Sequence, residues 1–573
     1  MSRHLQKLKK ENQKENNFAV IDIETMKWTK FLVLGYYDGL TFTEFRKPKS
    51  FFKFLEAQNI DTIFAHFAGK FDFLFILQWA FEHKIEIENI IPRGATILCL
   101  TLKINNKKYN FRDSSALLPF SLKSITDNFK TSTRKGEWDH SKTKGYSKEL
   151  AAYLKADCIS LHESLTAFFN WPLIKKSGPS ITIASQSLRV FRTFLKNDLA
   201  NPGKFINNFA RKAYFGGRVE IFKPYCKKGP IYEYDVNSLY PFVMKESFFP
   251  IGRGVLTFKY QTKFLGIYDC IVTTPKLHIP CLGIIHDKKY IFPVGQFRGR
   301  FTNIEIDYAR SLGYKIETKN GIYFPQKEKI FTDYIAELHA IKNYADEDSV
   351  NYILAKLLMN SLYGRFALNL NRENISLDLQ LGAKEFREIK LKGKSIMLYK
   401  VPVELESYTH VAISSFVTSY ARVHMHKLMN PIAQSVYYSD TDSIFTTSQL
   451  KTGNELGQLK LKRTEDSAIF LLPKTYITLN KNSKNIKMKG FSSKKTNDFT
   501  FEDFKNALEG DLKRFKIVNE PKFATLKQAL AKNKIVTMTK QSEKQLKALY
   551  NKRIIYKNSS GDILTKPITL MGE

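Results

Sequence analysis

The sequence predicts several domains of α/β and α+β structure, and three observations carry this prediction. First, a chain of 573 residues is too long to fold around a single hydrophobic core. Second, 43% of its residues are apolar and 13% are aromatic, as expected of a packed globular protein. Third, strand and helix patterns mix up to about residue 168 and then meet helix breakers at residues 170–172 and 177–180. The main domain boundary is therefore expected near residues 170–182.

The net charge is +35, from 90 Lys and Arg against 55 Asp and Glu, and indicates a polyanionic partner such as nucleic acid. The five cysteines form no Cys-x-x-Cys pair, so we expect no zinc site, no disulfide bonds and a reducing, cytoplasmic setting inside a host cell. No apolar run approaches the ~18 residues of a membrane span, so no membrane partner is expected. Residues 1–17 are basic and polar and are predicted to be a frayed lead-in.

The first domain is predicted to gather four carboxylates. Its first apolar strand pattern places Asp22 and Glu24 on one face, because alternate residues of a strand share a face. Asp72 follows an apolar segment and a glycine turn, and Tyr153 precedes Asp157 by one helical turn. Four carboxylates suit two divalent metal ions, with Tyr153 placed to orient an attacking water. The alternative is that each acid is an ordinary surface residue.

A second carboxylate set lies in the rest of the chain. Asp440 and Asp442 belong to a predicted strand, turn and strand at residues 438–443, and Asp235 ends an earlier apolar strand. Oxygen ligands of this kind suit Mg²⁺, so we expect these three acids to form a two-metal site, with Mn²⁺ as a substitute ion. Val236 is expected to add its backbone carbonyl. The alternative is a solvated turn, which is the usual meaning of an isolated Asp-x-Asp.

A predicted helix between these acids presents Lys356, Asn360, Tyr363 and Gly364 on one face. This face suits a nucleoside triphosphate, because the lysine meets phosphates, the amide reaches sugar or phosphate, and the tyrosine and glycine bound the nascent base pair. The alternative is an amphipathic helix with a polar face.

Three motifs make the chain resemble family B DNA polymerases. Asp-Val-Asn-Ser-Leu-Tyr-Pro from Asp235, Lys-Leu-Leu-Met-Asn-Ser-Leu-Tyr-Gly from Lys356 and Tyr-Ser-Asp-Thr-Asp-Ser from Tyr438 are similar to motifs A, B and C. Lys474-Thr475-Tyr476 is similar to the Lys-x-Tyr motif that follows them. Tyr-Phe-Gly-Gly at residues 214–217 and Thr-Ser-Tyr-Ala-Arg at residues 418–422 narrow the resemblance to the protein-primed branch of small tailed phages, adenoviruses and linear plasmids.

The resemblance implies a ribonuclease-H-like 3′–5′ exonuclease domain over residues 18–175 and a right-hand polymerase domain over residues 182–573. Asp235, Asp440 and Asp442 then belong to the palm. The other parts are expected as a terminal-protein insertion at about 250–335, fingers at about 336–367, a second insertion that helps to enclose DNA at about 370–402, and a thumb at about 480–573. Ordinary lengthened loops are the alternative for both insertions.

The resemblance also implies roles for single residues of the polymerase domain. Tyr240 is expected to be a steric gate, because a ring under the sugar leaves no room for a 2′-hydroxyl. Other nucleotide contacts are expected from Val236, Ser238, Leu239, Lys342, Lys356, Asn360, Tyr363 and Gly364. DNA contacts are expected from Tyr214, Gly216, Gly217, Thr418 and Arg422, with Lys474 and Tyr476 holding the primer end.

The acids of the first domain resemble the Exo I, II and III motifs of DEDD-type proofreading exonucleases, in the variant with a tyrosine. This implies single-strand contacts by His66, Phe71 and Ser114, and Lys142 matches a lysine that assists exonuclease catalysis. The chain departs from the family at two positions. Phe67 stands where an asparagine usually contacts single-stranded DNA, and Ser115 stands where leucine is usual.

The function expected is that of a protein-primed, DNA-directed DNA polymerase with a proofreading exonuclease, replicating a linear viral or plasmid genome. Its expected partners are template and primer DNA, deoxynucleoside triphosphates and a terminal protein, as a monomer or as a heterodimer with that protein. Two alternatives remain open. One is a family B polymerase that extends only nucleic-acid primers, and the other is a nuclease or DNA-binding subunit with a silent polymerase fold.

Overall fold

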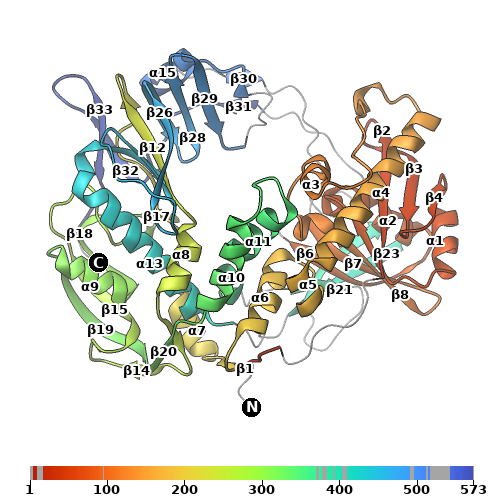
Figure 1. Cartoon of the computed structure of the whole chain (residues 1–573), viewed down its shortest axis with the longest axis horizontal. Helices are drawn as coiled ribbons and strands as arrows, with labels where there is room; N and C mark the ends of the chain where they lie inside the picture. The colour runs from red at the N-terminus through yellow and green to blue at the C-terminus, as the bar shows by residue number, and fades with distance from the viewer. Residues whose placement is uncertain are drawn as a thin grey trace.

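The computed structural model describes residues 4–8, 17–93, 96–368, 373–376, 384–391, 394–402, 409–490, 496–510, 514–516 and 543–571. Residues 17–177 lie on one side of the molecule, and most of the described residues from 219 onward lie on the other (Figure 1). The strands at residues 373–376, 384–391 and 394–402 are an exception, because they lie with the first part. Between the two sides lie α6 (Ile183–Phe194), α10 (Thr332–Asn343) and α11 (Val350–Ser361). No helix in the described ranges is long and apolar enough to cross a bilayer.

The N-terminal part is a sheet covered by helices on both faces. Its strands run in the order β6 (Glu86–Arg93), β7 (Thr96–Ile104), β8 (Lys107–Asp113), β5 (Thr62–Ala65), β2 (Ala19–Met26), β3 (Lys30–Tyr37) and β4 (Phe42–Phe45). Because successive strand residues face opposite sides, Val20 packs in one core with α3 (Leu122–Phe129) and α4 (Lys148–Asn170). Ile21 packs in the other core with α1 (Pro48–Glu56) and α2 (Asp72–Glu82).

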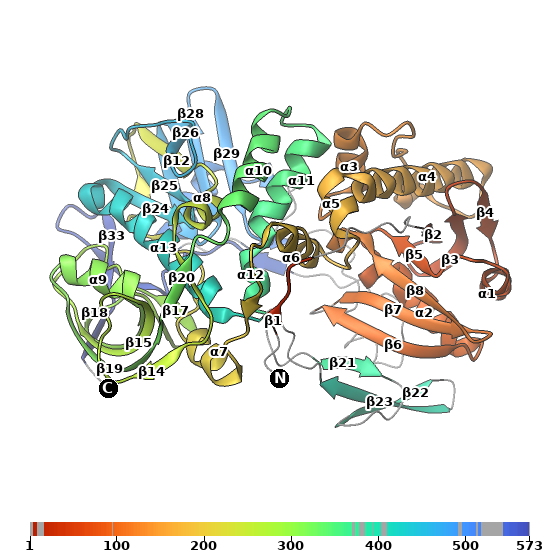
Figure 2. The ribbon, with the colours of Figure 1, turned by 60° about the horizontal axis from the view of Figure 1, so that its bottom comes forward.

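The predicted second insertion extends this same sheet. Strands β21 (Glu373–Ser376), β23 (Lys394–Pro402) and β22 (Lys384–Leu391) continue it beyond β6, with Ile375 opposite Ile90. Figure 2 shows these strands under the N-terminal sheet. A segment that follows the predicted fingers in the sequence is therefore attached to the N-terminal sheet.

A five-stranded sheet forms the centre of the C-terminal part. Its order is β10 (Val219–Ile221), β24 (Val436–Asp440), β25 (Ser443–Thr446), β12 (Ile231–Val236) and β26 (Leu459–Glu465). One face packs with α8 (Leu239–Glu246) and α13 (Val411–Met429) through residues such as Val236 and Ile444. The other face packs Tyr438 and Phe445 against Phe470.

Two further sheets flank this centre. The 250–335 region forms β14 (Val255–Thr257), β19 (Lys315–Phe324), β15 (Leu265–Thr273) and β18 (Val294–Thr302), with α9 (Asn303–Ser311). The other sheet contains β11 (Tyr225–Cys226), β27 (Ser467–Leu472), β28 (Thr475–Asn480) and β29 (Ser483–Met488), with α15 (Phe501–Glu509).

Both ends of the chain differ from the sequence-based expectation. Residues 1–17 were expected to fray, but β1 (His4–Leu5) pairs with β9 (Leu199–Ala200), and Leu5 is buried. The region 480–573 was expected to be one thumb, but its last described part joins another sheet. There β34 (Thr569–Met571) pairs in parallel with β18 of the flanking 250–335 sheet, and the hairpin of β32 (Arg553–Lys557) and β33 (Ile563–Pro567) precedes it.

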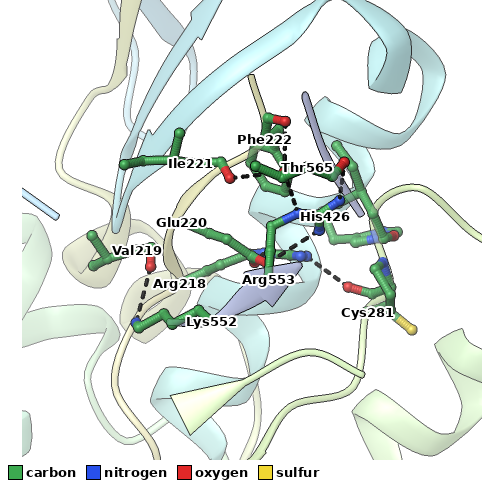
Figure 3. Close-up of polar contacts among 12 residues, drawn as sticks. Arg218, Val219, Glu220, Ile221, Phe222, Cys281, His426, Lys552, Arg553 and Thr565 are labelled. Carbon is green, nitrogen blue, oxygen red and sulfur yellow. Dashed lines mark hydrogen bonds and ion pairs between the residues drawn. The ribbon is translucent and has the colours of Figure 1, made fainter. Parts of the chain in front are cut away.

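A buried ion cluster holds this C-terminal hairpin against β10 (Figure 3). The Glu220 carboxylate accepts from Arg218 Nε at 2.6 Å and lies 3.1 Å from Arg553 Nη1. Arg553 also donates to Thr565 Oγ1 at 2.8 Å and to the His278 carbonyl at 3.0 Å. Burial alone would raise the pKa of Glu220, but the two guanidinium groups hold it below its usual value. The hairpin thereby fixes the strand that pairs with Asp440.

Replacing Arg553 with methionine is expected to lower the free energy of unfolding by about 3 kcal/mol, because removing one partner leaves buried charge and acceptors unsatisfied. The midpoint of thermal unfolding should fall by roughly 2–4 °C. Lys557→Met, at an exposed position of the same strand, is the control and should change it little. Equal shifts for the two variants would show that the ion cluster does not stabilise the fold.

Two candidate carboxylate centres

The central sheet brings Asp235 and Asp440 to one face. Ser443 lies between them, directly opposite Asp235 on β12 and directly opposite Asp440 on β24. Directly opposed residues project to the same face of a sheet, and the two acid-bearing strands are therefore about 10 Å apart. Asp442 lies in the turn between β24 and β25, and its carbonyl accepts from Val236 N at 2.8 Å. All three predicted acids thus meet at one sheet end.

The pKa of Asp442 is affected by the closeness of these acids. Burial first, and then the neighbouring Asp235 carboxylate, raise the pKa of Asp442 to about 6. Two lysines meet the other acids: Lys462 Nζ lies 3.0 Å from Asp235 Oδ2, and Lys474 Nζ lies 3.1 Å from Asp440 Oδ1. Carboxylates that repel one another and attract nearby ammonium groups fit a cation site.

Four of the predicted nucleotide residues form two close groups. The Tyr240 ring, on α8, stacks on the Tyr363 ring of α12 (Tyr363–Phe366) at 4.6 Å. Lys342 and Lys356 come from different helices, and both place their Nζ over the Tyr352 ring, at 5.4 and 5.6 Å. Burial and the ammonium of Lys356 lower the pKa of Lys342. Two such lysines provide a docking point for a phosphate chain.

Other predicted residues of this set have backbone or packing roles. Asn360 is exposed and donates to the Lys356 carbonyl at 3.0 Å. Ser238 begins α8 with a φ of 50°, and Leu239 is buried below it. Gly364 lies in α12 next to Tyr363, and no heavy atom among the described residues comes within 4 Å of a Cβ built on it.

The Tyr-Phe-Gly-Gly segment at residues 214–217, the glycine element, lies beside the turn that contains Thr441 and Asp442. A Cβ on Gly217 would come within 2.7 Å of Thr441 Cγ2, so only glycine permits this approach. Tyr214 lines an open groove of about 830 Å³, which also contains Arg211, Lys212 and Arg298. Such a basic groove with a tyrosine suits a nucleic-acid strand.

Thr418 and Arg422 were expected to contact the template, and the structure corrects this. Both side chains are buried. Arg422 Nη2 lies 2.7 Å from the Glu305 carboxylate, and Nη1 donates to the carbonyls of Phe215 and Gly216 at 2.7 and 3.2 Å. Arg422 therefore positions the glycine element instead of reaching DNA itself.

Tyr476 is corrected in the same way, because its ring packs against Phe445 and Phe470 and is only 4% exposed. Lys474 remains accessible and lies at Asp440. Its backbone N donates to the Tyr438 hydroxyl at 2.9 Å, which joins this loop to the acid-bearing strand.

The second centre lies in the N-terminal part. Asp22 and Glu24 come from β2, Asp72 is the first residue of α2, and Tyr153 and Asp157 share one face of α4. Together they line one cavity of about 400 Å³.

These acids repel one another strongly. Burial and Asp157 raise the pKa of Asp22 to about 6, and burial and Asp22 raise that of Glu24 to about 9. Burial, and then Asp22, also raise the pKa of Asp72. Among the described residues, Asp72 Oδ1 and Asp157 Oδ1 are buried without a hydrogen-bond partner. Unpaired carboxylate oxygens in a cluster of four acids fit divalent cations. No three His, Cys, Asp or Glu side chains in the described ranges are already arranged around a metal position.

The lysine at this centre is Lys135, a residue that the sequence reasoning missed. Its ammonium pairs with Asp157 and lies 2.7 Å from the Tyr153 hydroxyl. Lys142, which was expected there, is 84% exposed and pairs with Asp139 at 3.4 Å, so the structure corrects that prediction. His140 also enters the site, with Nδ1 3.5 Å from Glu24 Oε2. Lys135 and Lys142 both precede α4 in the sequence, and no local pattern distinguishes one from the other.

His66 and Phe71 line the cavity as predicted, but Ser114 does not. The Ser114 side chain is fully buried, donates to the Ala65 carbonyl at 3.1 Å and lies 2.9 Å from His66 Nδ1. His66 Nε2 also lies 2.8 Å from the Phe120 carbonyl. Ser114 therefore orients His66, which corrects the expected DNA contact.

The proteins that are similar to this chain are DNA polymerases. The family model described as DNA polymerase type B, organellar and viral, matches residues 53–151 and 142–435. A "Probable DNA polymerase" of Neurospora intermedia is 30% identical over 454 residues, which is 72% of this chain and 45% of the relative. The "DNA-directed DNA polymerase" of Enterobacteria phage PRD1 is 25% identical over 469 residues, 77% of this chain and 78% of the relative. The chain thus spans less than half the length of the fungal relative.

A solved structure shares the fold. Phi29 DNA polymerase, in an orthorhombic crystal form, superposes with a TM-score of 0.75 at 21% identity, covering 93% of this chain and 100% of that one. The same phage enzyme complexed with primer-template DNA and incoming nucleotide substrates gives a TM-score of 0.74.

Proposed function

Because the chain belongs to the organellar and viral type B DNA polymerases, we propose that it is a template-directed DNA polymerase with a 3′–5′ proofreading exonuclease. The observation that carries the proposal is the arrangement of seven acids in two separate centres, one on the central sheet and one in the N-terminal cavity. The basic surplus of the chain supplies the sequence-independent attraction to DNA.

For synthesis, Asp235, Asp442 and the carbonyl of Val236 would hold two Mg²⁺, which lower the pKa of a primer 3′-hydroxyl and stabilise charge at phosphorus. Lys342 and Lys356 bind the triphosphate of the incoming nucleotide. Tyr240, supported by Tyr363, sits under the sugar.

In the polymerase centre, Lys474, whose Nζ lies 3.1 Å from Asp440 Oδ1, would bind the terminal phosphate of the primer near the acids. The hydroxyl of the primer then attacks the α-phosphate, and pyrophosphate leaves.

For excision, Asp22, Glu24, Asp72 and Asp157 would hold the divalent ions that activate water. Tyr153 accepts a hydrogen bond from Lys135 and is thereby fixed next to Asp157, where its hydroxyl orients the attacking water. His66, held by Ser114, faces the strand end.

We propose initiation on a terminal protein, with a protein hydroxyl replacing the primer 3′-hydroxyl as nucleophile. The folded 250–335 region, with its own core, supports a docking role. Incubation with template, labelled dATP and the candidate terminal protein should yield a labelled protein adduct. Extension of ordinary primers without any adduct would favour the nucleic-acid-primed alternative.

The proposed function itself is tested with the purified chain, Mg²⁺ and two labelled substrates. A primed template should be extended when the four deoxynucleoside triphosphates are present, and a single strand should be shortened from its 3′ end when they are absent. A chain that binds both substrates and changes neither, with Mg²⁺ or Mn²⁺, would be the silent DNA-binding subunit.

Tyr240→Val is expected to lower discrimination against ribonucleotides by roughly tenfold to a hundredfold, because removal of the ring opens space beside the 2′ carbon. The measurement is the ratio of kcat/KM for dATP and ATP on the same primed template. Tyr240→Phe keeps the ring and should keep the ratio. A ratio unchanged in Tyr240→Val would place the gate elsewhere.

A further inference from the structure

Two large aromatic residues at the exonuclease cavity have backbone conformations that such residues avoid. Phe67 has φ of 55° and ψ of 22°, directly before the short helix at Ala68–Lys70. Trp28 has φ of 62°, next to Lys27 at 52°, in the turn that joins β2 to β3. Positive φ brings Cβ against the backbone, so Gly, Asn or Asp normally occupies such positions. The local backbone conformation therefore does not favour phenylalanine at position 67 or tryptophan at position 28.

Packing does not explain the exposure of Phe67 either. Phe67 is 54% exposed although it is a large apolar side chain. Its ring touches the His66 ring edge-on at 4.6 Å, and both residues line the cavity that contains the four acids. Trp28 lines the same cavity, 5.1 Å from the His140 ring and 5.9 Å from the Phe71 ring. Both rings have positive φ and line a reactive cavity, and the Phe67 ring is also exposed, which indicates a binding role.

The chemistry of the cavity indicates what these rings bind. Four acids repel the phosphates of a DNA end, and the ammonium of Lys135 is already paired with Asp157. Within this cavity, contacts that carry no charge add affinity for an unpaired strand without opposing the acids. Base stacking on aromatic rings meets this need and accepts any base, because every base has a π-face.

We propose that Phe67 and Trp28 form a stacking clamp for the unpaired terminal bases of a 3′ single strand. The clamp rests on the proposed exonuclease function and specifies how that site grips its substrate. In this chain, stacking by Phe67 takes the place of the hydrogen bonds that an asparagine amide offers at the same position of the resembled motif.

The test combines protein variants with abasic DNA. Binding of a labelled single strand is measured by fluorescence anisotropy in EDTA, which prevents cleavage, with either normal or abasic residues at the two 3′-terminal positions. The wild type should bind the normal strand roughly tenfold more tightly than the abasic one. Phe67→Ala and Trp28→Ala should each lose most of that preference and bind the abasic strand as the wild type does. Phe205→Ala, which removes a 61% exposed ring outside the cavity, is the control.

Thermal unfolding separates a binding role from a structural one. Phe67→Asn should leave the midpoint unchanged or raise it, because asparagine accepts a left-handed backbone, while the preference for normal bases falls. A lower midpoint together with equal losses on both strands would overturn the clamp, as would retention of the preference in both alanine variants. If the wild type shortens single strands but binds normal and abasic strands equally well, the clamp is refuted and the exonuclease function is not. A wild type that prefers bases but never shortens the strand refutes the exonuclease and not the clamp.

Discussion

Asp442→Asn is expected to lower the rate of primer extension by roughly 10³-fold or more. Asparagine keeps the size of the side chain but removes the negative charge at the turn, where Asp442 and Asp235 lie close enough to raise the pKa of Asp442. Charge stabilisation by a bound metal supplies several kcal/mol at the transition state, and each 1.4 kcal/mol corresponds to a factor of ten. Single-turnover extension of a labelled primer measures the loss.

The same variant should shorten a single strand at the wild-type rate, because Asp442 lies on the central sheet and not in the N-terminal cavity. Asp466→Asn, which removes an exposed acid after β26, is the matched control and should extend primers normally. Extension by Asp442→Asn at near the wild-type rate would remove the polymerase assignment.

Asp22→Ala combined with Glu24→Ala is expected to reduce 3′ excision by roughly 10³-fold or more. The pair supplies two of the four acids around the cavity, so the remaining acids cannot hold two divalent ions. Because removal of two mutually repelling, buried carboxylates also relieves repulsion, the variant should not unfold more easily than the wild type. Shortening of a 5′-labelled single strand and thermal unfolding are the two measurements.

Primer extension by this double variant should match that of the wild type, and mismatched 3′ ends should persist in its products. Glu88→Ala, at a position on β6 outside the cavity, is the control for a lost acid in the same domain. Loss of extension together with excision would contradict two independent centres.

The sequence alone determined the family and the fold class, and it predicted the two sets of acids. The family is confirmed by the matching family model, and the fold class by the structural likeness to the phage polymerase. This was possible because catalysis fixes residue types within short segments, as in Asp440 and Asp442 at alternate positions of one strand and turn. Their order along the chain carries the resemblance without any knowledge of contacts.

Tertiary structure alone decided which residues are accessible. Thr418, Arg422, Ser114 and Tyr476 occur in motifs, yet their side chains are buried and act on neighbouring protein groups. A motif records the type of residue and its spacing, but burial depends on partners that are distant in sequence. Arg422, for example, is held by Glu305.

The same reason explains the two chain ends and the lysine of the proposed exonuclease centre. Glu220 and Arg553 meet across 333 positions, and neither carries a local pattern that names the other. Lys135 and Lys142 are both lysines in a polar loop, and only the path of that loop over α4 brings one of them to Asp157. The sequence shows which residue types occur in each short segment, whereas the packing of the whole chain determines which distant residues come into contact.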